Sequence, residues 1–119
     1  AYEKAPDTKF RHTITQGGKV VMEVESDTAT GFNTGTITLE KPVVKWYSDK
    51  GMLIIKGNAG YLQKKTGDVR FEEEVSAQSV KWGQISCSRL DWNKNKGRIT
   101  AEGKVRGEFY LDSYVEGKT

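Results

Sequence analysis

The chain has few of the residues from which most catalytic and metal sites are built. Its 119 residues include one histidine, His12, and one cysteine, Cys87. One cysteine excludes an internal disulfide, and a tetrahedral zinc site needs more histidine or cysteine ligands than these two residues provide. Ser-His-Asp or Cys-His catalysis would have to use His12, and nothing in its polar segment pairs it with a nucleophile. We therefore expect no enzyme active site, no metal and no cofactor. We expect His12 at the surface and Cys87 buried in a strand.

Long apolar runs and proline are also scarce. No apolar run approaches the roughly 20 residues of a membrane-spanning helix, and no charged-plus-apolar leader marks a signal peptide. Of the two prolines, Pro42 interrupts a run of strand-forming residues and indicates a bulge or a sheet edge. Glycine-rich phosphate loops of the P-loop or dinucleotide type are absent. The 19 basic and 16 acidic residues are closely interleaved, which is typical of a solvated surface.

Glycine and strand-forming residues are abundant instead. The chain has 13 glycines, and Val, Ile, Thr, Tyr, Phe and Trp occur in short runs, which favours strands and tight turns. A pattern recurs at a spacing of 46 residues: Trp46 to Gly57 and Trp92 to Gly103 each read as strand, turn, strand. The Asp49-Lys50-Gly51 and Asn95-Lys96-Gly97 segments supply the turn residues. The repeat predicts strand pairs of similar design.

Apolar and polar residues alternate along most of these runs, so each strand has one apolar and one solvated face. This pattern predicts an all-β antiparallel sheet that packs on one side. Two segments depart from it. The run from Met52 to Ile55 is expected to be covered on both faces. In the acidic run Glu72-Glu73-Glu74, which we interpret as an exposed strand, Glu73 would point toward the apolar side.

The alternation does not decide whether the apolar faces form a closed core or a binding surface. Residues 1–14 are poorly patterned, and residues 15–119 form one predicted domain. The apolar faces either fill a closed structural core or, in a sheet that does not close, hold an acyl chain at about 0.8 kcal/mol per buried CH₂. A separate alternative is a small β-domain that binds nucleic acid or glycan through basic loops and the residues Trp46, Trp82 and Trp92.

Several segments resemble one protein family. The stretch from Ile37 to Gly51, with its leucine, proline, aromatic and Asp-x-Gly order, is similar to the opening strand pair of the LptC-type and OstA-like lipopolysaccharide-transport domains. The segments 54–62, 68–75, 85–92 and 97–105 resemble the later units of that family. Glu102-Gly103-Lys104-Val105 matches its final signature, whereas Glu73-Glu74 replaces the usual Gly-Asn. The resemblance covers about residues 15–117.

The resemblance implies an open, twisted, V-shaped β-jellyroll with no substantial helix. Such a periplasmic domain binds lipopolysaccharide through lipid A and hands it along an apolar groove, as a transfer or scaffold domain in outer-membrane biogenesis. Its partners would be other β-jellyroll proteins of the same transport system, an inner-membrane transporter complex and copies of itself, all joined by edge-strand pairing, with no nucleic acid. Related domains carry an N-terminal membrane helix as an inner-membrane anchor, and this sequence contains none.

Two sets of residues carry this expectation. The edge strands are predicted around Val20 to Glu25 and around Phe109 to Glu116, because strand edges present unpaired N–H and C=O groups. The predicted groove residues are Val20, Met22, Val24, Ile37, Leu39, Trp46, Val69, Phe71, Val75, Trp82, Leu90, Trp92, Ile99, Val105, Phe109 and Leu111.

Overall fold

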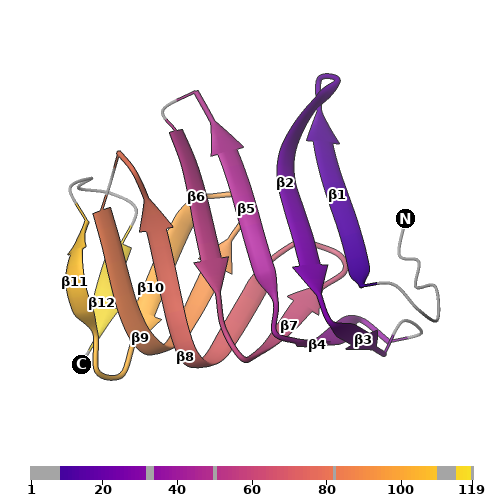
Figure 1. The fold of residues 1–119 in the computed structure, drawn as a ribbon. Helices are drawn as coiled ribbons and strands as arrows, with labels where there is room; N and C mark the ends of the chain where they lie inside the picture. The colour runs from indigo at the N-terminus through magenta and orange to yellow at the C-terminus, as the bar shows by residue number, and fades with distance from the viewer. Residues whose placement is uncertain (1–8, 32–33, 50, 82, 110–114, 119) are drawn as a thin grey trace.

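The described part of the chain is built from strands alone. The computed structural model describes residues 9–31, 34–49, 51–81, 83–109 and 115–118, and no helix occurs among them (Figure 1). The strands are β1 (Phe10–Gln16), β2 (Lys19–Ser26), β3 (Thr28–Thr30), β4 (Thr36–Glu40), β5 (Val43–Ser48), β6 (Gly51–Lys56), β7 (Ala59–Gln63), β8 (Val69–Ser79), β9 (Gly83–Asn93), β10 (Arg98–Glu102), β11 (Arg106–Phe109) and β12 (Val115–Lys118). The predicted all-β antiparallel class is confirmed, and β10 with β12 forms a parallel pair within it.

The strands form one sheet that folds back on itself. The first half of β8 pairs with β7 and its second half pairs with β6, while β9 pairs with β8 on both sides of the bend. In the same way β9 pairs with β10 along one half and with β11 along the other. The first layer therefore contains β1, β2, β5, β6, the second half of β8, the first half of β9, and β11. The second layer contains β3, β4, β7, the other halves of β8 and β9, β10 and β12 (Figure 1).

The two layers meet along a row of corners that we call the fold line. Left-handed backbone conformations bend the chain there, at Lys41 (φ 50°), Glu73 (φ 63°), Glu74 (φ 55°) and Lys104 (φ 50°). Backbone hydrogen bonds join one corner to the next. The N–H groups of Asp27, Lys41, Asn58 and Ser88 donate to the carbonyl oxygens of Glu40, Asn58, Glu73 and Gly103, respectively. Because the corners are hydrogen-bonded to one another, the fold line behaves as a continuous seam.

The fold line explains the position of Glu73. The β8–β9 register shifts between Glu72 and Val75, so that Glu73 and Glu74 together stand opposite one residue of β9. Both side chains are exposed. A β-bulge of this kind bends the strand and releases the bulged residues from the alternation. Glu73 therefore does not enter the core, although simple alternation would have placed it there.

One apolar core lies between the layers. Met22, Val24 and Ile55 of the first layer and Phe71 and Leu90 of the second are all fully buried in it. Burying a side chain of this size contributes roughly 1.5–3 kcal/mol. Cys87 is also buried in the core, as predicted. Pro42 lies at the fold line, where its missing N–H removes no ladder hydrogen bond.

Two expectations about local structure are wrong. Leu53 and Ile55 are buried, but Met52 is 40% exposed and Ile54 is half-buried, so the Met52–Ile55 run is covered on one face only. No described element packs against the outer face of β6. The segment from Val20 to Glu25 is not an edge, because β2 pairs with β1 on one side and with β5 on the other.

The edge position belongs to β1, which begins at Phe10 inside the segment that lacked a clear pattern. Only Phe10 and Ile14 of its inward positions are strongly apolar, and a register shift follows Ile14. These features conceal the alternation in the sequence.

Candidate functional site

Most of the predicted groove residues lie in the packed core. Those that are buried are Met22, Val24, Ile37, Leu39, Val69, Phe71, Val75, Leu90, Trp92 and Ile99. Trp46 and Val105 are half-buried and pack against this core, whereas Val20 is 41% exposed. Trp82 and Leu111 lie outside the described residues, as does the side chain of Phe109. The structure thus brings the buried and half-buried members of the predicted set together around one interior, which their own side chains fill.

A surface opening lies between the ends of the two layers, opposite the fold line. We call it the mouth. It encloses a hollow of about 340 Å³, lined from the first layer by Gln16, Val21, Trp46 and Tyr47 and from the second by Lys94, Asn95, Lys96 and Gly97. The strands β1, β2 and β5 position the first group, and the β9–β10 turn positions the second. The mouth therefore has a mixed lining, in which Val21 and Trp46 are the apolar residues and two lysines stand at the rim.

Two tryptophans connect the mouth to the core. The ring centroids of Trp46 and Trp92 lie 5.1 Å apart at an interplanar angle of 58°. This separation and tilt are typical of a favourable aromatic pair. Trp46 is half-buried and lines the mouth, whereas Trp92 is 1% exposed. The Nε1–H of Trp92 is buried and has no acceptor among the described residues, which is uncommon because buried donors are nearly always paired.

Hydrogen bonds hold the lysine rim in place. The Lys94 backbone N–H donates to Asp68 Oδ1 at 3.0 Å, and the Lys96 backbone N–H donates to Asn93 Oδ1 at 2.9 Å. Both bonds fix the β9–β10 turn against the end of the second layer. On the opposite side of the mouth, the Tyr47 hydroxyl donates to Glu23 Oε1 at 2.8 Å. This hydrogen bond to a carboxylate raises the pKa of Tyr47 above its ordinary value.

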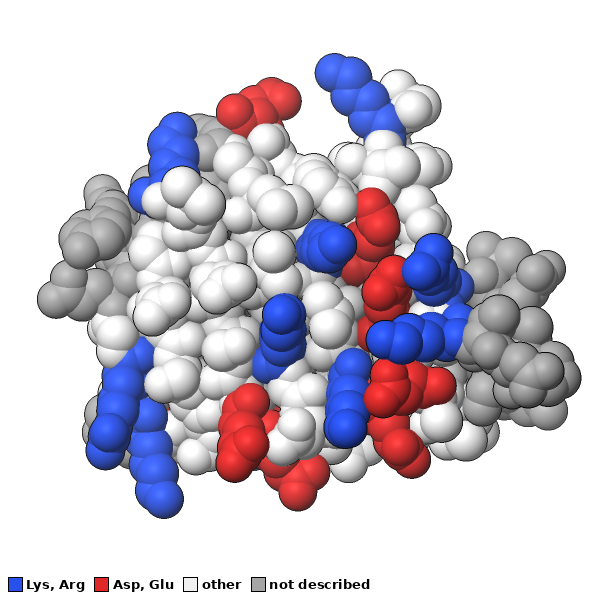
Figure 2. Space-filling view, viewed as in Figure 1, with Lys and Arg blue, Asp and Glu red and all other residues white. Residues whose placement is uncertain are grey.

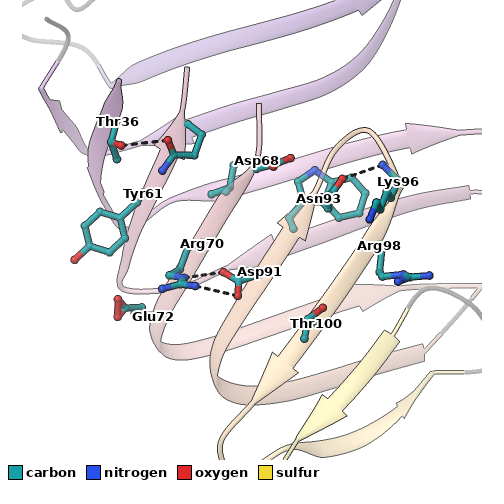
Figure 3. A pocket seen from close by; sticks show the side chains of 13 residues that line it. Thr36, Tyr61, Asp68, Arg70, Glu72, Asp91, Asn93, Lys96, Arg98 and Thr100 are labelled. Carbon is teal, nitrogen blue, oxygen red and sulfur yellow. Dashed lines mark hydrogen bonds and ion pairs between the residues drawn. The ribbon is translucent and has the colours of Figure 1, made fainter. Parts of the chain in front are cut away.

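A second, larger hollow of about 670 Å³ lies on the outer face of the second layer (Figure 3). At its centre, Arg70 Nε and Nη2 contact Asp91 Oδ1 and Oδ2 at 2.7 and 3.3 Å, a bidentate pair that raises the pKa of Arg70. Tyr61 lies beside this pair with its ring toward solvent. The charged lining residues are Asp68, Glu72 and Asp91 against Arg70, Lys96 and Arg98, so their formal charges cancel.

The ends of the sheet offer strand edges. Within the described residues, β1, β3, β11 and β12 each pair with one strand: β1 in the first layer and β3 in the second at one end of the molecule, and β11 and β12 at the other. The predicted C-terminal edge, Phe109 to Glu116, includes the end of β11 and the start of β12, and residues 110–114 lie outside the described ranges. Edges like these expose backbone groups that can pair with another chain.

Other types of site find no support in the ranges that the structure describes. There, no group of three or more His, Cys, Asp or Glu side chains is placed to hold a metal ion. No described segment forms a helix long and apolar enough to cross a membrane. His12 is half-buried in β1. Burial raises the pKa of the Cys87 thiol, which opposes formation of the nucleophilic thiolate.

Val21 and Tyr47 line the mouth but were absent from the predicted set. Opposite the register shift in β1, Thr15 pairs with Val20 while Ile14 pairs with Met22, so Val21 is the extra residue of a bulge. No sequence signal marks this bulge. Tyr47 follows Trp46 directly, and strict alternation assigns it to the outer face. The proximity of Trp46 to the Lys94–Lys96 turn follows only from the folding of the sheet.

Comparison with known proteins adds no assignment. No protein-family model matches this chain, and no curated protein matches it.

Proposed function

We propose that this chain is a lipopolysaccharide-binding transfer or scaffold domain of the LptC or OstA type, working in the periplasm. The observation that carries the proposal is the mouth. There, the apolar surfaces of Val21 and Trp46 meet the lysine rim of Lys94 and Lys96 above a continuous apolar interior. An amphiphile with acyl chains and phosphate groups has the complementary chemistry. The sequence resemblance to the transport domains supports the same assignment.

In this proposal the ligand enters between the layers. Lipid A phosphates pair with Lys94 and Lys96, since ammonium groups bind phosphate by charge-assisted hydrogen bonds. An acyl chain lies against Trp46 and Val21, gaining about 0.8 kcal/mol for each CH₂ removed from water. The interior below is filled, so deeper entry requires the layers to part at the mouth. The fold line on the opposite side keeps its hydrogen bonds during that movement.

Transfer between domains would use the sheet ends. A partner strand that pairs with β1 or β3, or with β11 or β12, would continue the sheet and bring two interiors into line. The proposed partners are related β-jellyroll proteins, an inner-membrane transporter complex and further copies of this chain. An N-terminal helix upstream of the present sequence would supply inner-membrane anchoring.

Site-specific crosslinking tests the mouth. A photo-reactive benzoylphenylalanine at Val21 is expected to capture lipid A, whereas the same group at Thr38, exposed on the outer face of β4, is not. The Lys94→Glu/Lys96→Glu variant should lower capture at Val21 by about tenfold or more, because it reverses two charges beside the phosphates. Equal capture of lipid A at Val21 and at Thr38 would contradict the proposal.

The alternative is a β-domain that binds glycan or nucleic acid. The balanced charges of the outer hollow favour an uncharged saccharide over a polyanion, and Tyr61 offers a ring for stacking. Isothermal titration calorimetry of the wild type and of Tyr61→Ala with neutral oligosaccharides tests this alternative. Binding of single-stranded DNA with a steep salt dependence would support the nucleic-acid form instead.

A further inference from the structure

Exposed apolar residues gather at the hairpin tips of the first layer. The large hydrophobic residues with high exposure in the described ranges are Val20 (41%), Met52 (40%), Tyr61 (36%) and Val80 (109%). Three of these lie within three residues of a tip: Val20 after the β1–β2 turn, Met52 after the β5–β6 turn, and Val80 in the β8–β9 turn. The three tips point to the same side of the molecule (Figure 1). They form a rim, which we call the tip rim.

The tip rim continues into an uncharged surface. Between the β5–β6 and β8–β9 hairpins lies a hollow of about 660 Å³ with mostly apolar walls, including Met52, Ile54 and Val80. Cross-strand pairing extends it over neutral residues, because Ile54 stands opposite Gln78 and Gln78 opposite Gln84. Figure 2 shows the broad white area that results over β6 and the neighbouring strands, with the charged groups around it. Exposed apolar patches bordered by polar residues often mark interaction sites.

The charges at the tips indicate what this rim contacts. Lys19 is exposed beside Val20, and Lys81 is exposed beside Val80; Asp49 is the acidic residue of the third tip. Apolar side chains next to lysines are typical of groups at a membrane interface, since the apolar atoms enter the acyl boundary while the ammonium groups reach lipid phosphates. The formal net charge of +3 adds attraction to an anionic surface.

We propose that the tip rim, formed by Val20, Met52 and Val80 with Lys19 and Lys81, docks on the surface of an anionic lipid bilayer. This inference adds a membrane-docking step to the proposed function, and the use of that step depends on the proposed function. Gln16, at the end of β1 next to the first tip, also lines the mouth. A bilayer held at the tips would therefore lie next to the opening through which a lipid enters. Docking positions the mouth to receive a lipid from the membrane.

Vesicle co-sedimentation tests docking directly. We expect the protein to bind vesicles of phosphatidylcholine mixed with phosphatidylglycerol, and to bind pure phosphatidylcholine vesicles much more weakly. Val80→Asp should weaken binding about tenfold, since it puts a charge where an apolar group enters the interface. Lys19→Gln and Lys81→Gln should each weaken it about fivefold, the value of one basic contact with an anionic surface. Tyr61→Asp, on the outer face of the other layer, is the matched control and should change nothing.

The outcomes separate docking from its competitors. Equal binding of wild type and Val80→Asp, or an equal loss in Tyr61→Asp, overturns the proposal. If Val80→Asp instead abolishes self-association in analytical ultracentrifugation with no effect on vesicles, the rim is an interface between copies of this chain. Crosslinking of dispersed lipid A at Val21 is measured without vesicles. Loss of docking with Val21 capture intact therefore rejects this inference alone, and loss of capture with docking intact rejects the proposed function.

Discussion

Replacement of Trp92 by phenylalanine has two opposing effects on stability that are similar in size: a void in the core and the removal of an unpaired indole N–H. Trp92 is 1% exposed, and its Nε1–H has no acceptor among the described residues. The smaller ring leaves a void of roughly 40 Å³, which costs about 1–2 kcal/mol with the lost contacts. Removal of a buried unpaired N–H returns about 1–3 kcal/mol. We therefore expect Trp92→Phe to lower the free energy of unfolding by no more than about 1 kcal/mol.

Urea denaturation followed by far-ultraviolet circular dichroism measures this change. Trp92→Ala serves as the reference, because it removes the whole ring and should cost about 3–5 kcal/mol. Trp46→Phe, at the half-buried partner ring, controls for loss of the aromatic pair. A loss above about 3 kcal/mol in Trp92→Phe would refute the reasoning. It would mean that the indole N–H is hydrogen-bonded in the native protein and that its partner stabilises the fold.

Three further predictions follow from the same structure. Gly107→Ala should cost more than about 2 kcal/mol in urea denaturation, because φ is +105° and the new Cβ would lie 2.2 Å from a backbone carbonyl oxygen of β9. Gly18→Ala, at φ +78° in open space, should cost only about 1 kcal/mol. Burial raises the pKa of Cys87, so a thiol reagent at mildly alkaline pH should react slowly with the native protein and rapidly in urea; fast native labelling would contradict the buried position. The hydrogen bond to Glu23 raises the pKa of Tyr47 above its ordinary value of 10.0. The stability that this bond contributes is therefore fully present below pH 10.0 and is lost as the pH rises through the pKa of the folded state. The stability difference between wild type and Tyr47→Phe should therefore shrink above about pH 10, and a constant difference would contradict the bond.

The alternation of apolar and polar residues was sufficient to predict the fold class and much of the core. Positions such as Met22, Val24 and Ile99 follow the period of two, and burial on one face is the consequence of that period. The repeat around Trp46 and Trp92 also identified two residues that lie together at the candidate site. These features are local, since each depends on neighbours two positions apart or on a turn within the same hairpin.

The fold line was beyond such local reasoning. In β9 the buried positions change from Ile85 and Cys87 to Leu90 and Trp92, which reverses the alternation where the strand bends. In β8 the two left-handed residues Glu73 and Glu74 absorb the bend instead. Within a short segment of sequence, these positions only interrupt the alternation of apolar and polar residues. They become corners only when neighbouring strands supply hydrogen-bond partners from distant parts of the chain.

The sequence by itself therefore determined that this is an all-β protein with one apolar face per strand and with very few groups for catalysis. Only the tertiary structure decided that β1 is an edge, that Trp46 faces the Lys94–Lys96 turn, and that Val20, Met52 and Val80 share a rim. The physical reason is that alternation fixes the side of a strand on which a residue lies. Which residues meet across layers or at a common end depends on where the whole sheet folds, and backbone pairing between distant strands sets that position.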